Sequence, residues 1–330
     1  MAKVNIRGIA EKAGVSAAAV SYVLNGKPGV SAETRERILH IIAQEGYAPN
    51  MNSRRLATSR SYNILLVTEE KSPLSNLFYA SILGALSEVC GRRGYSLVLA
   101  GQKEAVQAIR QSNADGLIFL KDPEDETRQI LLRENAPFAV IDSQFSDPPY
   151  DCVRADYCSA IRTVTEYVIA QGHRRIGLFS RTDIPEYHAT TLRGFREAME
   201  AAGCELRKDW IFGDAVDMEA AKVCMERLLS MPERPTALVC AGDLIALAAM
   251  TRFREAGGNI PLDCSFASVD DLSVSQLYYP PLTTVQIDPC EMAEKAVMLL
   301  EKRYGGEREP EVVTVCSQKL IVRGSVCPPK

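Results

Sequence analysis

The sequence has few of the residues from which metal and disulfide sites are built. Among its 330 residues there are three histidines and one tryptophan. Its ten cysteines lie between Cys90 and Cys327, and no two of them are spaced as C-x-x-C. We therefore expect reduced, mostly buried cysteines that behave as small apolar side chains. Neither a metal site nor a cofactor is expected.

Long apolar runs are also missing. The opening stretch, MAKVNIRGIAEKAG, carries charges throughout, which argues against a secretory signal or a membrane-spanning helix there. We expect a cytoplasmic protein with no membrane partner. Nucleophile-elbow, P-loop and G-x-G-x-x-G motifs are absent as well, so we do not expect an enzyme.

Charge is distributed unevenly along the chain. Residues 1–60 contain nine Lys and Arg against four Glu, a net charge of +5, whereas the remaining 270 residues carry 29 basic and 38 acidic side chains, a net charge of −9. A small basic module attached to a large acidic body suits binding of the DNA phosphate backbone by the first part only.

Residues 5–24 predict two short helices joined by a tight turn. Gly14 permits the turn and Ser16 can cap the second helix. Apolar residues recur at helical spacing before and after this turn: Ile6, Ile9 and Ala10, then Val15, Val20, Val23 and Leu24. This pattern is typical of a helix-turn-helix, with Ala17, Ala18, Ser21 and Tyr22 facing outward.

A third helix is predicted from a Ser31 cap to Glu45, ending at Gly46. It is expected to bury four apolar side chains beneath the first two helices: Ile38, Leu39, Ile41 and Ile42. Three short helices would then share one small core.

The segment IAEKAGVSAAAVSYVLNGKPGVSAETRERI, followed by YAPNMNSRRL, resembles the headpiece and hinge of the lactose-repressor family. The resemblance implies a DNA-binding headpiece over residues 1–48, whose second helix enters the major groove. It implies a hinge over residues 49–61 that folds on DNA and wedges Leu56 into the minor groove. A basic, flexible linker is the alternative for that segment.

The DNA-contacting positions implied by the resemblance are Ser16, Ala17, Ala18, Ser21, Tyr22, Asn25, Ser31, Thr34, Tyr47, Asn50, Ser53, Arg54 and Leu56. The family more often has arginine where this chain has Tyr22, and its common threonine is Ala19 here. Guanine recognition by a bidentate arginine is therefore not carried over, and alanine contacts to thymine methyl groups are the alternative.

From residue 62 onward, short apolar runs alternate with amphipathic stretches. Seven strands are predicted, at Asn63–Thr68, Ser96–Ala100, Gly116–Leu120, Phe138–Asp142, Ile176–Ser180, Ala237–Cys240 and Phe266–Val269. Helices are predicted at Leu77–Arg93, Asp156–Gln171, Thr191–Ala202, Met218–Leu229 and Leu244–Ala256. This alternation predicts an α/β body of two doubly wound parallel-sheet lobes.

Two phrases, GHRRIG and PPLTTVQIDPCEMAEKAVMLL, resemble the effector domain of the same family, which is similar to periplasmic binding proteins. The resemblance covers residues 62–330. It implies one lobe at about 62–158 and 290–317, a second at about 159–289 and 318–330, and a ligand in the cleft between them.

The resemblance places seven residues at ligand positions: Phe78, Asp142, Tyr187, Thr191, Ala215, Gly242 and Asp270. Asp142 and Asp270 match carboxylates that hydrogen-bond the ligand in relatives, although a strand-end cap is the plainer alternative. Thr191, Gly242 and Ala215 stand where relatives have arginine, asparagine and tryptophan. These differences argue against a simple pyranose ligand, and Tyr187 and His188 are candidate replacements.

The sequence thus predicts a transcriptional regulator, most simply a repressor, whose affinity for operator DNA is controlled by a sugar or related metabolite. The lack of a leucine-heptad tail favours a homodimer on a pseudo-palindromic operator over a tetramer. The alternative is a solute-binding or sugar-binding sensor without a DNA-regulatory role, which the body alone would support.

Overall fold

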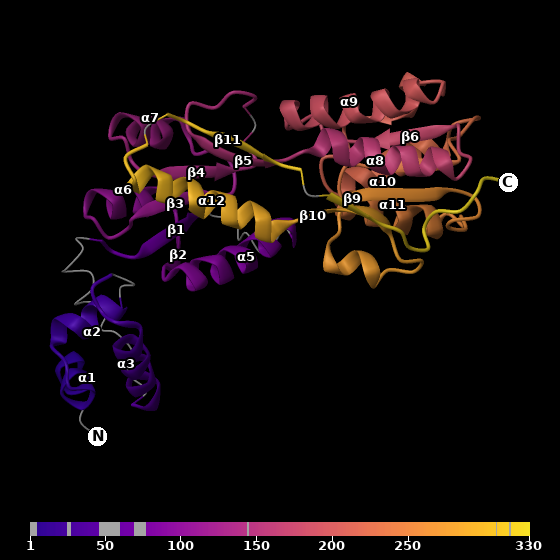
Figure 1. Cartoon of the computed structure of the whole chain (residues 1–330). Coiled ribbons are helices and arrows are strands. Elements are labelled where there is room, and N and C mark those ends of the chain that lie inside the picture. Colours follow the sequence, from indigo (N-terminus) through magenta and orange to yellow (C-terminus); the bar gives the residue numbers. More distant parts are fainter. Residues whose placement is uncertain are drawn as a thin grey trace. The chain divides into compact units, whose positions relative to one another are not determined.

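The computed structural model describes residues 5–24, 28–45, 60–68, 77–143, 145–307, 309–316 and 318–330. The chain divides into two units, Met1–Tyr62 and Asn63–Lys330. Within the described residues, the first unit is helical and the second contains two six-stranded sheets (Figure 1).

The first unit contains α1 (Ile6–Ala13), α2 (Ala17–Leu24) and α3 (Ala32–Gln44). The predicted turn lies between α1 and α2, where Gly14 adopts φ +65°, a conformation that glycine reaches without steric cost. The Ser16 hydroxyl accepts a hydrogen bond from Ala19 N at 3.1 Å, and that of Ser31 accepts one from Thr34 N at 3.3 Å. Both predicted serine caps are therefore present.

A small apolar core joins these three helices. Ile9, Val20 and Ile38 are fully buried in it, and Ile41 and Ile42 pack against it. The prediction that Leu39 joins this core is wrong, since its side chain is 48% exposed. Adjacent residues on a helix point in directions roughly 100° apart, so Leu39 faces away when Ile38 faces inward.

The first sheet of the larger unit has the strand order β11-β5-β4-β3-β1-β2, and all of its pairings are parallel. Its strands are β1 (Asn63–Val67), β2 (Ser96–Ala100), β3 (Gly116–Phe119), β4 (Phe138–Ile141), β5 (Asp151–Ala155) and β11 (Val312–Val315). We call this sheet and its helices lobe one.

The second sheet has the order β12-β10-β9-β8-β6-β7 and is parallel except for the pairing of β12 with β10. Its strands are β6 (Ile176–Phe179), β7 (Ile211–Phe212), β8 (Ala237–Cys240), β9 (Ser265–Asp270), β10 (Thr283–Ile287) and β12 (Gln318–Ile321). This sheet and its helices form lobe two. The expected class of two doubly wound α/β lobes is confirmed.

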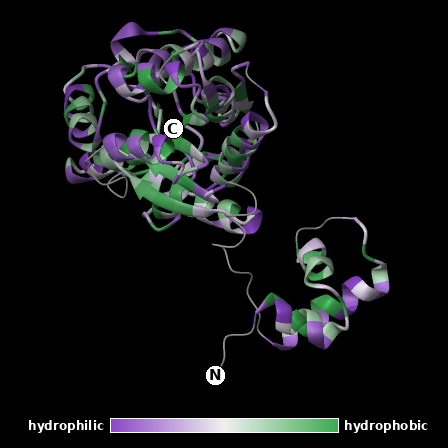
Figure 2. Ribbon diagram, turned by 90° about the vertical axis from the view of Figure 1, so that its left-hand side faces the viewer, coloured by the Kyte–Doolittle hydropathy of each residue, from purple (hydrophilic) through white to green (hydrophobic). Residues whose placement is uncertain are grey.

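Helices cover both faces of each sheet. In lobe one, α6 (Gln102–Arg110) and α7 (Asp125–Arg133) lie on one face, and α5 (Leu77–Arg93) and α12 (Pro289–Tyr304) pack together on the other. In lobe two, α10 (Met218–Leu229) and α11 (Asp243–Glu255) lie opposite α8 (Tyr157–Ala170) and α9 (Pro185–Ala201). Figure 2 shows apolar strands enclosed by helices of mixed hydropathy, as expected for sheets buried on both faces.

The seven predicted strands are present, and five further strands were missed: β5, β7, β10, β11 and β12. Most of these are short or polar, such as DCVRA in β5 and TTVQI in β10. Helix α9 begins at Pro185 rather than at the predicted Thr191, because a proline at the first helical position is compatible with a helix start. Helices α6, α7 and α12 were not predicted.

Two glycines provide a test of helix packing in lobe two. A Cβ atom on Gly194 of α9 would lie 2.1 Å from the carbonyl oxygen of Cys158 on α8, whereas one on Gly84 of α5 would meet no atom within 4 Å. We expect Gly194→Ala to lower the free energy of unfolding by about 3 kcal/mol or more through overpacking. Gly84→Ala should raise it by about 0.5–1 kcal/mol through helix propensity. Urea titration measures both, and an unchanged Gly194→Ala protein would contradict this close contact.

Candidate functional site

The candidate DNA-binding surface in the first unit lies on α2. Tyr22 is 45% exposed and Ala18, one helical turn earlier, is also exposed, while Ser21 is half-buried. Ala17 does not face fully outward as predicted, because it lies three residues before the buried Val20 and packs against the same core. The free face of α2 is therefore centred on Ala18 and Tyr22.

The remaining implied DNA contacts divide into two groups. Ser31 is exposed at the N-terminus of α3, and its hydroxyl donates to Thr34 Oγ1 at 2.9 Å, so these two side chains form one capping unit. The others lie outside the described residues: Asn25, Tyr47, Asn50, Ser53, Arg54 and Leu56.

The second candidate site is a cavity of about 560 Å³ in the larger unit, lined by residues of both lobes. Several lining residues end or directly follow parallel strands: Asp142 after β4, Arg181 after β6, Gly242 after β8 and Asp270 at the end of β9. The carboxyl ends of parallel strands are where doubly wound sheets bind ligands.

Five of the seven residues expected at ligand positions line this cavity: Phe78, Asp142, Tyr187, Gly242 and Asp270. Thr191 and Ala215 are fully buried and do not line it. The Thr191 hydroxyl lies 2.9 Å from Ser180 Oγ and donates to the Tyr187 carbonyl, whereas Ala215 belongs to the apolar core of lobe two. Their neighbours Thr190 and Val216 line the cavity instead.

His188 does not replace the missing ligand groups either. Its Nδ1 lies 3.2 Å from the Ser180 hydroxyl, and burial lowers the pKa of the ring below its ordinary value. Because one ring nitrogen is directed at Ser180, His188 acts as a packing residue between α9 and β6.

Sequence reasoning missed most of the polar and aromatic groups in the wall. The missed groups include Tyr79, Arg154, Tyr157, Arg181 and Asp183. A signal was available, since Arg154 and Tyr157 flank the end of β5 and Arg181 follows β6. It was overlooked for β5 because that strand itself was not predicted.

Two tyrosines occupy the centre of the wall. The rings of Tyr157 and Tyr187 meet edge to face, with centroids 4.6 Å apart. The Tyr157 hydroxyl donates to Asp142 Oδ2 at 3.2 Å, and the Tyr187 hydroxyl donates to the Ala241 carbonyl at 3.0 Å. Aromatic faces and edges are thus presented to the cavity while both hydroxyls are hydrogen-bonded.

Two half-buried carboxylates face the same space. Burial raises the pKa of Asp142 to about 6, and the Tyr157 hydroxyl opposes part of that rise. Burial also raises the pKa of Asp270 well above its ordinary value, and the negative charges of Asp243 and Asp142 raise it further. Asp142 comes from lobe one and Asp270 from lobe two, so the two lobes present acidic side chains to each other, and ionisation of one disfavours ionisation of the other.

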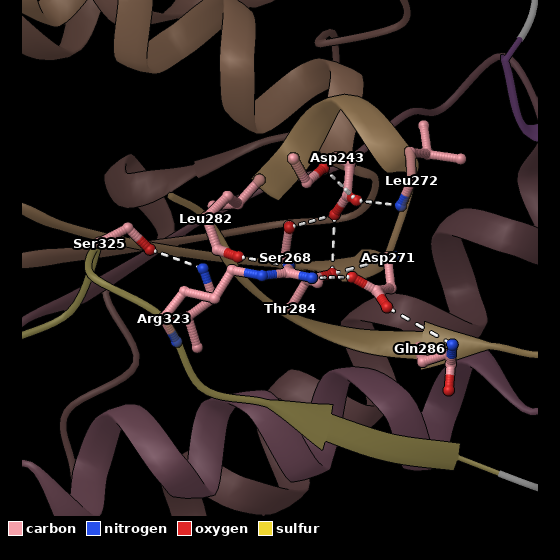
Figure 3. Close-up of polar contacts among 11 residues, drawn as sticks. Asp243, Ser268, Asp271, Leu272, Leu282, Thr284, Gln286, Arg323 and Ser325 are labelled. Carbon is pink, nitrogen blue, oxygen red and sulfur yellow. Dashed lines mark hydrogen bonds and ion pairs between the residues drawn. The ribbon is translucent and has the colours of Figure 1, made fainter. Parts of the chain in front are cut away.

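A third carboxylate, that of Asp243, is fully hydrogen-bonded (Figure 3). Asp243, the first residue of α11, accepts hydrogen bonds at 2.5–2.7 Å from three hydroxyls and one backbone amide: Ser268, Ser275, Thr284 and Leu272 N. Its own N–H donates to Asp270 Oδ2 at 3.4 Å. Asp243 therefore supports the cavity wall without lining it.

The backbone that presents Asp270 is in an unusual conformation. Asp270 and Asp271 have φ values of +120° and +57°, which non-glycine residues rarely adopt. The Asp271 carboxylate forms a mostly buried ion pair with Arg323 at 2.6 Å, and Arg323 also donates to the Leu282 carbonyl (Figure 3). The C-terminal segment thus holds the loop that carries Asp270.

Comparison with known proteins agrees with this arrangement. Residues 5–50 match bacterial regulatory proteins of the lacI family, and residues 165–326 match the periplasmic binding protein-like domain. The chain is 31% identical to the HTH-type transcriptional repressor PurR of Haemophilus influenzae (strain PittEE), covering 97% of this chain and 98% of that protein. The chain belongs to the LacI family.

Other LacI-family proteins show the same extent of similarity. The ribose operon repressor of Haemophilus influenzae is 28% identical over 97% of this chain and 98% of its own length. Among solved structures, a complex of the transcriptional regulator CelR with cellobiose superimposes with a TM-score of 0.72 at 27% identity, covering 98% and 99% of the two chains. The predicted LacI-family fold and the class of DNA-binding transcriptional regulators are confirmed.

Within its described residues, this LacI-family chain has no helix long and apolar enough to cross a membrane. The same residues contain no group of three or more histidine, cysteine or acidic side chains arranged to hold a metal ion. Six of the ten cysteines are buried.

The buried ion pair behind the cavity can be tested by a double-mutant cycle. Asp271→Asn or Arg323→Met alone should each lower the free energy of unfolding by about 3 kcal/mol, since either leaves a mostly buried charge without its partner. The double variant should lose less than the sum of the two. Lys330→Met is the matched control, because it removes an exposed ion pair with Asp263 from the same C-terminal segment and should leave the urea midpoint unchanged. Strict additivity of the two single changes would contradict the pairing.

The raised pKa of Asp142 predicts a pH-dependent effect on stability. Because the folded protein holds this proton up to about pH 6, whereas an unfolded aspartate loses it near 3.8, ionisation penalises the folded state as pH rises between these values. Asp142→Asn removes that penalty. The variant should match the wild type near pH 4 and exceed it by roughly 3 kcal/mol above pH 6.5. Urea unfolding across this pH range measures the difference, and a difference independent of pH would show that the folded protein does not raise the pKa of Asp142.

Proposed function

We propose that this LacI-family chain is a sequence-specific transcriptional repressor whose operator affinity is controlled by a small molecule bound in the cavity. The observation that carries the proposal is the first unit, in which a capped helix-turn-helix presents Ala18 and Tyr22 on the open face of α2. A solute-binding sensor would have no use for this unit.

Sequence readout is assigned to α2 in the major groove. The groove admits one helix, and a tyrosine and an alanine at adjacent turns can meet base edges and thymine methyl groups. Residues 1–60 carry a net charge of +5, which supports binding to the phosphate backbone, with the hinge expected at 49–61 wedging Leu56 into the minor groove. We expect a regulator of this kind to act in the cytoplasm.

Control is assigned to the larger unit. A homodimer would place two headpieces on the two halves of a pseudo-palindromic operator. The chain passes between the two lobes after β5, after β10 and between β11 and β12, so a ligand that changes the spacing of the lobes also acts on these three segments. Any such coupling is reciprocal, because operator DNA must change the affinity for the ligand by the same factor.

The direct experiment selects bound sequences from a random duplex pool with the purified full-length protein at a stated, moderate salt concentration. Enrichment of a pseudo-palindrome is expected, because two related headpieces read two half-sites. A pool that stays random, both alone and with cell extract metabolites added, would sink the repressor assignment in favour of a ligand sensor.

The role of Tyr22 can be tested on the selected operator. Tyr22→Ala should weaken specific binding by roughly 5-fold to 150-fold, the range for one lost base contact, while leaving affinity for random DNA unchanged. Leu39→Ala is the matched control, since Leu39 is an equally exposed apolar side chain on α3. Electrophoretic mobility shifts on operator and random duplexes give both affinities. Equal losses on the two duplexes would show that Tyr22 does not read bases.

A further inference from the structure

We propose that the molecule bound in this cavity carries a protonated amine, and that Asp142 and Asp270 bind this cation from opposite lobes. The inference rests on the proposed function in one respect, namely that the cavity holds a regulatory ligand. It adds the chemical class of that ligand, which the family match does not supply.

Neither of the two carboxylates forms an ion pair within the described part of the chain, although the charge of Arg154 lowers the pKa of Asp142. Asp142 and Asp270 both line the cavity, and no lysine or arginine of the described chain lies within ion-pair distance of either. Asp142 accepts hydrogen bonds from the Tyr157 hydroxyl at 3.2 Å and from the Ala155 backbone, and Asp270 accepts one from Asp243 N at 3.4 Å. Bringing two like charges to one desolvated space is unfavourable until a cation lies between them.

The wall of the cavity contains more acidic than basic side chains. Among the described lining residues there are six acidic side chains, Asp122, Asp142, Asp183, Glu186, Asp217 and Asp270, and three basic ones, Lys121, Arg154 and Arg181. Two of these nine neutralise each other, because Arg181 forms a two-pronged ion pair with Asp183 at 2.9 Å and 2.6 Å. The guanidinium of Arg154 donates to the backbone carbonyls of Phe145 and Ser146. The wall is therefore acidic overall, which favours a cation over an anion.

The wall of the cavity also contains four aromatic rings among the described residues. Phe78, Tyr79, Tyr157 and Tyr187 all line the cavity, and the rings of Phe78 and Tyr79 lie 5.8 Å apart at 58°. Ring faces attract ammonium groups, most strongly where water is excluded. A wall of carboxylates and aromatic rings attracts a protonated amine both by charge and by the ring faces. A hydroxyl group can only form hydrogen bonds with the carboxylates.

A neutral polyol is the competing ligand. Its hydroxyls could donate to both carboxylates, but they supply no positive charge that would favour the ionised forms of Asp142 and Asp270. An ammonium group donates hydrogen bonds and also cancels charge. The difference in binding affinity between an amine and its hydroxyl counterpart therefore measures how much the acidic wall contributes to binding.

The experiment compares matched pairs of probes by isothermal titration calorimetry on full-length protein at pH 7.5. The pairs are glucosamine and glucose, the deacetylated disaccharide chitobiose and cellobiose, and putrescine and 1,4-butanediol. They span sizes that a cavity of about 560 Å³ accepts. We expect at least one amine to bind tenfold or more tightly than its hydroxyl partner. Equal or tighter binding of every hydroxyl partner, or no binding by any amine, overturns the proposal.

Variants then assign the effect to the two carboxylates. Asp142→Asn and Asp270→Asn should each reduce the affinity for that amine at least tenfold, whereas Asp125→Asn, which removes an equal charge from an exposed site on α7, should not. Unchanged amine affinity in both cavity variants also overturns the proposal. The probe comparison on wild-type protein remains decisive if a variant fails to fold.

Operator binding in the same preparations separates this inference from the proposed function. If the protein selects a pseudo-palindrome but binds no amine, only the ligand class is wrong. If it binds an amine but selects no DNA, the repressor assignment fails and the ligand class stands.

Discussion

The buried carboxylate of Asp243 is the interaction on which the ligand-facing wall of lobe two depends. It has three hydroxyls and one amide as donors, contributed by β9, by the residues that follow it and by β10. A carboxylate taken out of water is costly unless its lone pairs are satisfied, and here both oxygens accept two hydrogen bonds. The network therefore fixes the start of α11, the end of β9 and the strand beside it as one unit.

This hydrogen-bond network allows the strained backbone at the end of β9 to persist. Two successive aspartates with positive φ persist only where the surroundings over-determine them. Asp243 holds the loop through Leu272 N on one side, and Arg323 holds it through Asp271 on the other (Figure 3). As a result, the position of Asp270 in the cavity is linked to the segment that follows β12, close to one of the passages between the lobes.

Both other passages between the lobes end in an aspartate that caps a helix. Asp156 accepts a hydrogen bond from Ser159 N at the start of α8, and Asp288 accepts bonds from Cys290 N and Glu291 N at the start of α12. Such caps fix where each helix begins, so bending between the lobes is confined to the few residues before them. Tyr157, directly after the Asp156 cap, bonds Asp142 of lobe one and packs against Tyr187 of lobe two. Tyr157 therefore lies both in the wall of the ligand cavity and next to the segment in which bending between the lobes is expected.

The sequence by itself determined the features that depend on local patterns: the capped helix-turn-helix, the seven most apolar strands and the α/β class. These follow from spacing, caps and burial on both faces, which neighbours along the chain reveal. Only the tertiary structure decided which side chains reach the cavity. Thr191 and Ala215 face the core while Thr190 and Val216 face the cavity, because a shift of one position along the chain turns a side chain to another direction, by roughly 100° in a helix such as α9. Tyr157, Arg181 and Asp270 line one cavity because separate strands end at the same place. No single stretch of the sequence reveals which strands do so.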